Sequence, residues 1–266
     1  MPIGRKIVAS LFFRFRRVWT RRLLAQEMIN TLNETKLHKT LKTLYAQQHE
    51  HSQVEAEIGP YIADILTADG SVIEIQTASL AHLLPKVQYC LTARRKITIV
   101  HPIAAEKYIE TTDSAGTRIS RRKSPQKKSL YTSFREYTGL AEVLLNPLVT
   151  VEVLEACITE ERETTPAPVQ SRNGRRRFKK TWIKTGKRLE AIYTTRVLHG
   201  RKAYLALLPD SLKEPFTVQQ LTEALQREGK KVHTQDTRLL LWVFTKAGLV
   251  DVDKTSRPHQ YYKKIS

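Results

Sequence analysis

The sequence has 266 residues, with 45 lysines and arginines against 26 aspartates and glutamates and a formal net charge of +19. Apolar residues make up 41%, which excludes a disordered chain, and two cysteines without a CxxC pair argue against a disulfide framework or a structural zinc site. No segment approaches the roughly 20 apolar residues of a membrane span. The cysteine usage fits a reducing cytoplasm, where we expect the protein, and the excess of positive charge favours a polyanionic partner.

Residues 1–30 are predicted to form a basic amphipathic helix. Its apolar run from Ile7 to Phe13 follows Arg5 and Lys6, as in a signal peptide, but it is short and is interrupted by Arg14. Such a helix can lie on acidic lipid, although packing on the protein or contact with phosphate is the favoured interpretation.

Residues 31–101 are predicted to follow the order helix, three strands, helix, strand. Helical spacing of leucines covers residues 31–48, and alternating apolar residues mark strands at 54–58, 61–66 and 71–77. Asp69-Gly70 between the last two strands is a strong hairpin signal. A helix over residues 79–91, with Pro85 in its interior, and a strand over 96–100 that ends at His101-Pro102 complete the unit.

Acidic side chains meet at this hairpin. Asp64 lies in one strand, and Glu74 and Gln76 share one face of the next, because side chains two residues apart on a strand point the same way. Two carboxylates are suitable ligands for Mg²⁺, which polarises a phosphate and activates water. Gln76 would orient that water or stabilise developing charge.

The helix with Glu34, the Ala63-Asp64 strand and Glu74-Ile75-Gln76 resemble the PD-(D/E)XK, or restriction-endonuclease-like, nuclease superfamily over residues 31–101. The resemblance implies that Asp64 and Glu74 bind Mg²⁺ or Mn²⁺ and that Glu34 is an auxiliary acid. It also implies catalytic roles for these residues and for Gln76, although the usual lysine is missing at that position. Some active members of the superfamily look similar at that position, whereas others with degraded motifs only bind.

Other polar residues near this motif have two interpretations each. Lys86 in the following helix could supply a displaced ammonium group, but a surface lysine is the favoured interpretation. His38 and His101 are within reach of the site and are interpreted as structural histidines. Asp64 and Glu74 themselves could be a turn residue and a solvated strand residue, which would leave no metal site.

Basic segments follow the predicted nuclease core, which we place at residues 31–158. Residues 103–128 are expected to hold a hairpin-like stretch and a basic loop with Arg121, Arg122 and Lys123, before a helix and a strand in 130–158. Residues 159–188 are predicted to be a basic linker that starts near TTPAP. Its Arg175, Arg176 and Arg177, interleaved with aromatic residues, are candidate phosphate contacts.

Residues 189–266 are predicted to form a small winged-helix domain. Helical patterning runs to Leu208, a capping box at Thr217 and Gln220 opens the next helix, and a helix over 234–247 precedes a hairpin. Gln235 and Arg238 on the last helix would face DNA bases, and Arg257 in the hairpin loop would contact phosphate. The whole chain is similar to an uncharacterised prokaryotic family that joins such a nuclease core to a winged helix.

The sequence therefore predicts an α/β protein with a restriction-endonuclease-like mixed sheet flanked by helices and a C-terminal winged helix. The leading functional interpretation is a metal-dependent hydrolase of phosphodiester bonds in DNA. A non-catalytic DNA-binding protein or regulator with a degenerate nuclease core is the alternative, and an RNA- or ribosome-associated protein is a third.

Overall fold

The computed structural model describes residues 35–266, except for 78, 171–173, 176, 254–259 and 266. The expected helix over residues 1–30 lies outside these described residues, and so do Glu34, Arg176 and Arg257. Within the described part of the chain, no helix has both the length and the apolar character that crossing a membrane requires.

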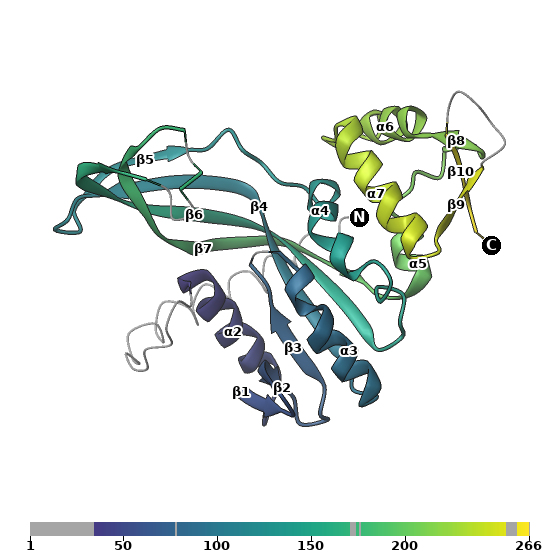
Figure 1. The fold of residues 1–266 in the computed structure, drawn as a ribbon, viewed down its shortest axis with the longest axis horizontal. Coiled ribbons are helices and arrows are strands. Elements are labelled where there is room, and N and C mark those ends of the chain that lie inside the picture. The colour runs from purple at the N-terminus through teal and green to yellow at the C-terminus, as the bar shows by residue number, and fades with distance from the viewer. Residues whose placement is uncertain (1–34, 78, 171–173, 176, 254–259, 266) are drawn as a thin grey trace, which may run out of the picture. The chain divides into compact units, whose positions relative to one another are not determined.

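The first six elements follow the predicted order (Figure 1). They are α2 (Lys36–Gln48), β1 (Gln53–Ile58), β2 (Tyr61–Leu66), β3 (Val72–Ile75), α3 (Leu84–Thr92) and β4 (Ile97–Thr112). Strands β1, β2 and β3 pair antiparallel in sequence, and β3 pairs with β4 in parallel. The predicted Asp69-Gly70 turn is confirmed: Gly70 has a φ of 78°, and the Thr67 N–H donates to the Ser71 carbonyl at 2.9 Å.

Helices cover both faces of this sheet. Ile73, Ile75 and Val100 belong to one buried cluster with Leu37 and Leu41 of α2. Val72, Ile97 and Ile99 belong to the other cluster, with Val87 and Cys90 of α3. Because side chains alternate along a strand, consecutive residues within β3, and likewise within β4, are buried on opposite faces of the sheet. The predicted α/β fold with a mixed sheet flanked by helices is confirmed.

Helix α3 begins later than expected. A 3-10 turn over Ala81–Leu83 precedes α3 (Leu84–Thr92), so Pro85 stands in the first turn of the α-helix and not in its interior. Proline fits there because the first N–H groups of a helix have no partner within it.

Strands β5 (Arg118–Lys123), β6 (Val149–Val169) and β7 (Lys180–Leu198) extend the sheet beyond the first unit, and β6 and β7 are long. The order of the sheet is β1-β2-β3-β4-β6-β7, with β5 paired to β4, and β6 and β7 forming an antiparallel pair. The predicted end of β4 at His101-Pro102 is wrong. The last residue pair between β3 and β4 is Ile75 with Val100, so Pro102 lies beyond that ladder. The strand can therefore continue through a proline, which has no N–H to donate.

The predicted basic linker over residues 159–188 is also wrong, because most of it lies in β6 and β7. Cross-strand pairs such as Glu160 with Lys187 and Thr159 with Arg188 join the two strands there. The irregular register between Thr164 and Val169 accommodates the two prolines of TTPAP. Likewise, residues 118–123 form β5 and not a loop, and 189–198 belong to β7 and not to a helix.

The C-terminal part combines three helices with a small sheet. Its elements are α5 (Gly200–Leu205), β8 (Phe216–Thr217), α6 (Val218–Arg227), α7 (Thr234–Lys246), β9 (Val250–Asp253) and β10 (Tyr261–Lys264). The predicted capping box is confirmed, since Thr217 Oγ1 accepts from the Gln220 N–H at 3.2 Å and Gln220 Oε1 accepts from the Thr217 N–H at 2.8 Å.

Among its described residues, this C-terminal part shares its core with the rest of the fold. Its buried residues belong to the same cluster as those under α3 and the short helix α4 (Phe134–Tyr137). The rings of Phe134 and Phe244 pack edge to face at 5.7 Å, and Tyr131 donates to the Leu207 carbonyl at 3.1 Å. The described residues after β7 are therefore packed against the α/β unit through a continuous apolar core.

Candidate functional site

Strands β2 and β3 part at Asp64 and Glu74. Their ladder includes Leu66 with Val72 and Ile65 with Ile73. Beyond it, side chains replace backbone pairing: the Asp64 N–H donates to Glu74 Oε1 at 3.2 Å, and the Ile75 N–H donates to Asp64 Oδ2 at 2.8 Å. The expected placement of Asp64 and Glu74 on adjacent antiparallel strands is confirmed. That the two carboxylates share one ion stays a prediction.

Glu74 is tied to α3 by Lys86. The Lys86 ammonium lies 2.7 Å from Glu74 Oε2 and also donates to the Ile62 carbonyl at 2.7 Å. Only 17% of the Lys86 side chain is exposed, so the favoured interpretation of a surface lysine is wrong. Lys86 lies four residues before the buried Cys90 and therefore on the helix face toward the sheet. This helical spacing was the signal that could have identified it.

The electrostatics of Glu74 follow from this position. It is 3% exposed, and this burial raises the pKa of the Glu74 carboxyl above its ordinary value. The nearby charge of Asp64 raises the pKa further, whereas the Lys86 ammonium lowers it. A buried carboxylate with a raised pKa beside a second carboxylate and an ammonium marks this cluster as a candidate functional site.

Asp64 is tied to the other helix, α2. His38 Nε2 lies 3.1 Å from Asp64 Oδ2, and the Lys42 ammonium lies 4.0 Å from Asp64 Oδ1 and 2.9 Å from Glu55 Oε1. His38 and Lys42 are four residues apart and so share one face of the helix. His38 therefore does reach the site, and its contact with Asp64 also agrees with its interpretation as a structural histidine.

Gln76 is the first residue after β3. Its backbone N–H donates to the Val100 carbonyl at 2.8 Å, and its own carbonyl lies 2.8 Å from His101 Nδ1. Within the described part of the chain, its side chain makes no hydrogen bond. The structure therefore brings Asp64, Glu74, Lys86 and His38 together by direct contacts, and it leaves the Gln76 side chain outside this set.

The candidate phosphate contacts on β5 differ in how they are paired. The Arg121 guanidinium lies 4.2 Å from the Tyr108 ring centroid and 3.7 Å from Glu110 Oε2, and Lys123 forms an ion pair with Glu106. Arg122 is exposed and makes no ion pair with any described residue. Among these three cations, Arg122 is the one whose charge is fully available to a partner.

The remaining candidates lie on the surface. Arg175 and Arg177 are exposed in the segment that joins β6 to β7, and Arg177 lies 5.4 Å from the Phe178 ring centroid. Gln235 and Arg238 are exposed near the start of α7, where Arg238 donates to Gln235 Oε1 at 3.3 Å. None of these residues contacts the Asp64 and Glu74 cluster.

Comparison with known proteins places residues 35–199 in the family described as a domain of unknown function, DUF8091, and the chain belongs to that family. An "Uncharacterized protein" from Treponema pallidum (strain Nichols) is 27% identical over 205 residues, which cover 77% of this chain and 76% of the relative. No solved structure matches the chain. The family range contains the Asp64 and Glu74 cluster and all seven strands of the large sheet, and it ends before α5.

Proposed function

We propose that this protein is a metal-dependent nuclease that hydrolyses phosphodiester bonds in DNA, with a PD-(D/E)XK-like core formed by α2, β1, β2, β3, α3 and β4. The order and pairing of these elements support the proposal, because they match the resemblance found in the sequence. The observation that carries it is the contact at 2.7 Å between Lys86 and Glu74, beside Asp64. It supplies a lysine that the motif strand lacks at Gln76.

The residues at this site fit Mg²⁺ or Mn²⁺. Asp64 and Glu74 would hold the ion as a pair. The described residues contain no larger group, of three or more histidine, cysteine or acidic side chains, that is placed to hold a metal. A pair of carboxylates suits Mg²⁺, which usually keeps several waters and binds one or two carboxylates together with substrate phosphate. When bound, such an ion polarises the phosphate and lowers the pKa of a coordinated water.

The protein's own groups prepare the site for a phosphate. Lys86 is held by Glu74 Oε2 and the Ile62 carbonyl, so its ammonium is fixed before a substrate arrives. A fixed cation stabilises the negative charge that develops on a phosphate during hydrolysis. His38 and the Ile75 N–H both contact Asp64 Oδ2 and thereby orient this carboxylate, leaving Oδ1 on the side of Lys42.

The DNA-binding part of the proposal is supported by charge and by the C-terminal elements. The order α5, β8, α6, α7, β9, β10, with β8 and β9 both paired to β10, is that of a winged helix. In such a domain α7 would enter the major groove with Gln235 and Arg238 near its N-terminal end. The net charge of +19 favours phosphate binding in the cytoplasm, where we propose that the protein acts.

A non-catalytic DNA-binding protein is the second candidate. The specific observation in its favour is that both carboxylates already have cationic partners inside the protein, Lys86 for Glu74 and Lys42 near Asp64. A cluster compensated in this way can persist as a structural element without binding a metal. Such a protein would retain affinity for DNA and cut none of it.

A cleavage assay separates these candidates. Purified protein is incubated with single-stranded DNA, duplex DNA and RNA in the presence of Mg²⁺, Mn²⁺ or EDTA. We expect divalent-ion-dependent cleavage of DNA that Asp64→Asn and Glu74→Gln abolish while binding is retained, since each change removes a proposed metal ligand. Cleavage that Asp64→Asn leaves unchanged contradicts the proposed site. Binding without cleavage supports the non-catalytic candidate, and a preference for RNA indicates the third interpretation.

A further inference from the structure

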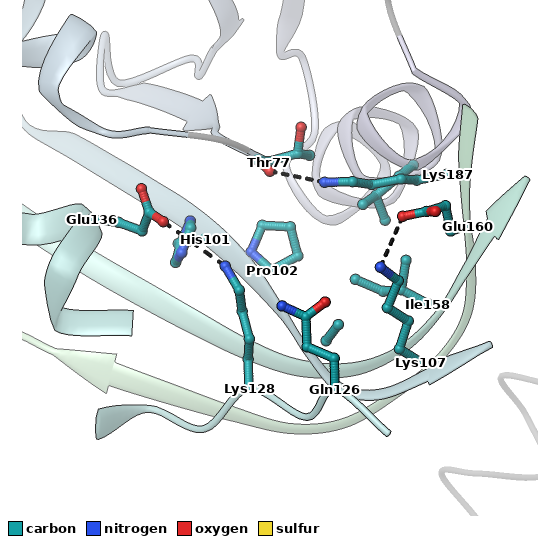
Figure 2. A pocket seen from close by; sticks show the side chains of 12 residues that line it. Thr77, His101, Pro102, Lys107, Gln126, Lys128, Glu136, Ile158, Glu160 and Lys187 are labelled. Carbon is teal, nitrogen blue, oxygen red and sulfur yellow. Dashed lines mark hydrogen bonds and ion pairs between the residues drawn. The ribbon is translucent and has the colours of Figure 1, made fainter. Parts of the chain in front are cut away.

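A cavity of about 100 Å³ lies on the α2 side of the sheet, next to the end of β3 (Figure 2). Its walls come from distant parts of the sequence, including Thr77 after β3, His101 and Lys107 on β4, Lys128 before α4 and Lys187 on β7. We call it the lysine pocket. Thr77 follows Glu74 by three residues, so the pocket adjoins the candidate site along the chain without sharing a residue with it.

Lys187 has no carboxylate partner in the pocket. Its ammonium lies 3.3 Å from the Thr77 carbonyl oxygen, and no carboxylate of the described residues is within ion-pairing distance. Burial and, to a smaller extent, the positive charges of Lys184, Lys128 and Lys107 together lower the pKa of Lys187 to about 8. A partly buried lysine that lies among other cations destabilises the folded chain unless an anion compensates it.

The other lysines in the wall share few carboxylates. Lys107 lies 2.8 Å from Glu160 Oε2 and Lys128 lies 3.8 Å from Glu136 Oε1. Glu160 also accepts from Arg162 and lies 3.8 Å from Lys184. The cations in and beside the pocket therefore outnumber the carboxylates: they are Lys107, Lys128, Lys184, Lys187 and Arg162 against Glu136 and Glu160.

His101 adds a polar atom that lacks a partner. The residue is 3% exposed, and its Nδ1 lies 2.8 Å from the Gln76 carbonyl, which can only accept a hydrogen bond. Nδ1 therefore carries the proton in the neutral ring, and Nε2 is left as an acceptor. This Nε2 is buried and has no hydrogen-bond partner among the described residues. Buried polar atoms without partners are rare in folded proteins and point to a missing ligand.

We propose that the lysine pocket binds a phosphate monoester, a phosphate group with three unesterified oxygens. Its oxygens would accept from Lys107, Lys128 and Lys187, and one proton would be shared with His101 Nε2. A phosphodiester of the nucleic-acid backbone fits less well, because it carries a single charge and has two free oxygens. The proposal concerns binding by this pocket and is independent of whether the Asp64 and Glu74 site is catalytic.

Two sources can supply this group: the terminal phosphate of a nucleic-acid strand, or a small molecule such as a nucleotide. Inorganic phosphate, which presents similar free oxygens, serves as the simplest probe. The experiment uses the full chain in EDTA, so cleavage plays no part and a failure of the nuclease proposal leaves the result unaffected. Binding of inorganic phosphate and a deoxynucleoside 5′-monophosphate is measured by calorimetry. Oligonucleotides with a 5′-phosphate or a 5′-hydroxyl are compared by fluorescence anisotropy.

We expect saturable binding of phosphate at one site, weakened roughly tenfold or more by Lys187→Gln and by His101→Gln, because each change removes a polar contact to a charged ligand. Lys202→Gln, on an exposed face of α5, is the matched control and should bind like the wild type. A preference for the 5′-phosphorylated oligonucleotide that Lys187→Gln removes assigns the pocket to strand ends. Equal affinity for both oligonucleotides, with phosphate binding retained, assigns it to small molecules.

Two results would overturn the proposal. One is the absence of saturable phosphate binding by the wild-type chain. The other is unchanged affinity in Lys187→Gln when its circular dichroism spectrum shows that it is folded. If His101→Gln does not fold, Lys187→Gln alone decides the outcome, because the Lys187 side chain is only half-buried.

Discussion

Lys86 and Glu74 form an ion pair at 2.7 Å, although one residue lies on helix α3 and the other on strand β3. Glu74 is 3% exposed and has the carboxylate of Asp64 as a neighbour, so its charge depends on this single ammonium. The lysine of the candidate site therefore comes from helix α3, whereas the sequence motif would place it on the strand, at Gln76.

The first prediction concerns the contribution of this ion pair to stability. Lys86→Met leaves a buried, unpaired carboxylate and is expected to reduce the free energy of unfolding by about 3 kcal/mol at neutral pH. The double variant Lys86→Met/Glu74→Gln should recover much of that loss, because it removes the charge as well. Urea denaturation measures both, with Lys202→Met as control. A loss below about 0.5 kcal/mol in the single variant would contradict the buried pair.

Lys187 gives a prediction for the pH dependence of stability. Its pKa is lowered from 10.5 to about 8, mainly by burial and then by the charges of Lys184, Lys128 and Lys107, with Glu160 acting in the opposite direction. The unfolded chain therefore binds more protons between pH 8 and 10.5, and stability rises with pH in that window. Below pH 8 the charged lysine destabilises the fold fully.

Lys187→Met should consequently raise the free energy of unfolding by about 2 kcal/mol below pH 8, after allowance for partial solvent screening. The gain should shrink as the pH approaches 10.5. Thermal unfolding at several pH values, without phosphate in the buffer, measures this difference. A variant that is less stable than the wild type at pH 7 would show that the Lys187 ammonium is compensated.

A third prediction concerns the unpaired cation on β5. Arg122→Ala should weaken DNA binding and flatten the slope of log affinity against log salt by about one contact, or roughly 0.9. Lys123→Ala, which removes a cation already paired with Glu106, should have a smaller effect on the slope. Sequence preference should not change in either variant, because phosphate contacts carry no base information. Equal slopes for Arg122→Ala and the wild type would place Arg122 away from DNA.

A fourth prediction tests α7. Arg238→Ala should reduce the affinity for a preferred duplex more than for unrelated DNA, because base contacts are expected from the N-terminal end of this helix. Lys246→Ala, in the last turn of the same helix, is the matched control. Binding is compared in the full chain, since the core of residues 200–266 is continuous with the rest of the fold. A uniform loss on all sequences would indicate a phosphate contact instead.

The order of the first six elements could be predicted because each leaves a local signal. Val72, Ile73 and Ile75 are apolar because Val72 is buried on one face of the sheet and the two isoleucines on the other. Gly70 adopts the positive φ that the turn requires. The capping box at Thr217 and Gln220 was readable for the same reason, since it depends on residues three positions apart.

The long β6–β7 pair could not be predicted from local patterns. Residues such as Glu160, Arg162, Lys184 and Lys187 gave this region the composition of a solvated linker. Backbone pairing between β6 and β7 holds them in strands, as with Glu160 opposite Lys187 and Arg162 opposite Lys184, and this pairing joins residues far apart in the sequence. Tertiary pairing here overrides local composition.

The candidate site was predicted only in part, for a similar reason. Asp64 and Glu74 could be placed together because one short hairpin connects them. The contacts of Lys86 and His38 with these carboxylates depend on how α3 and α2 pack on the sheet, which the local sequence does not encode directly. Gln76 was chosen by the spacing of the motif, and its side chain makes no hydrogen bond with either carboxylate.

Moving the lysine between helix and strand is the most direct test of the proposed nuclease. The initial rate of divalent-ion-dependent DNA cleavage is measured for the wild type, Lys86→Ala, Lys86→Ala/Gln76→Lys and the control Lys39→Ala, an exposed lysine on α2. We predict that Lys86→Ala lowers the rate at least about a hundredfold, as expected for the loss of a fixed group that stabilises the transition state. The double variant should recover a measurable part of the rate, and Lys39→Ala should leave it unchanged. Cleavage by Lys86→Ala at the wild-type rate would contradict the account.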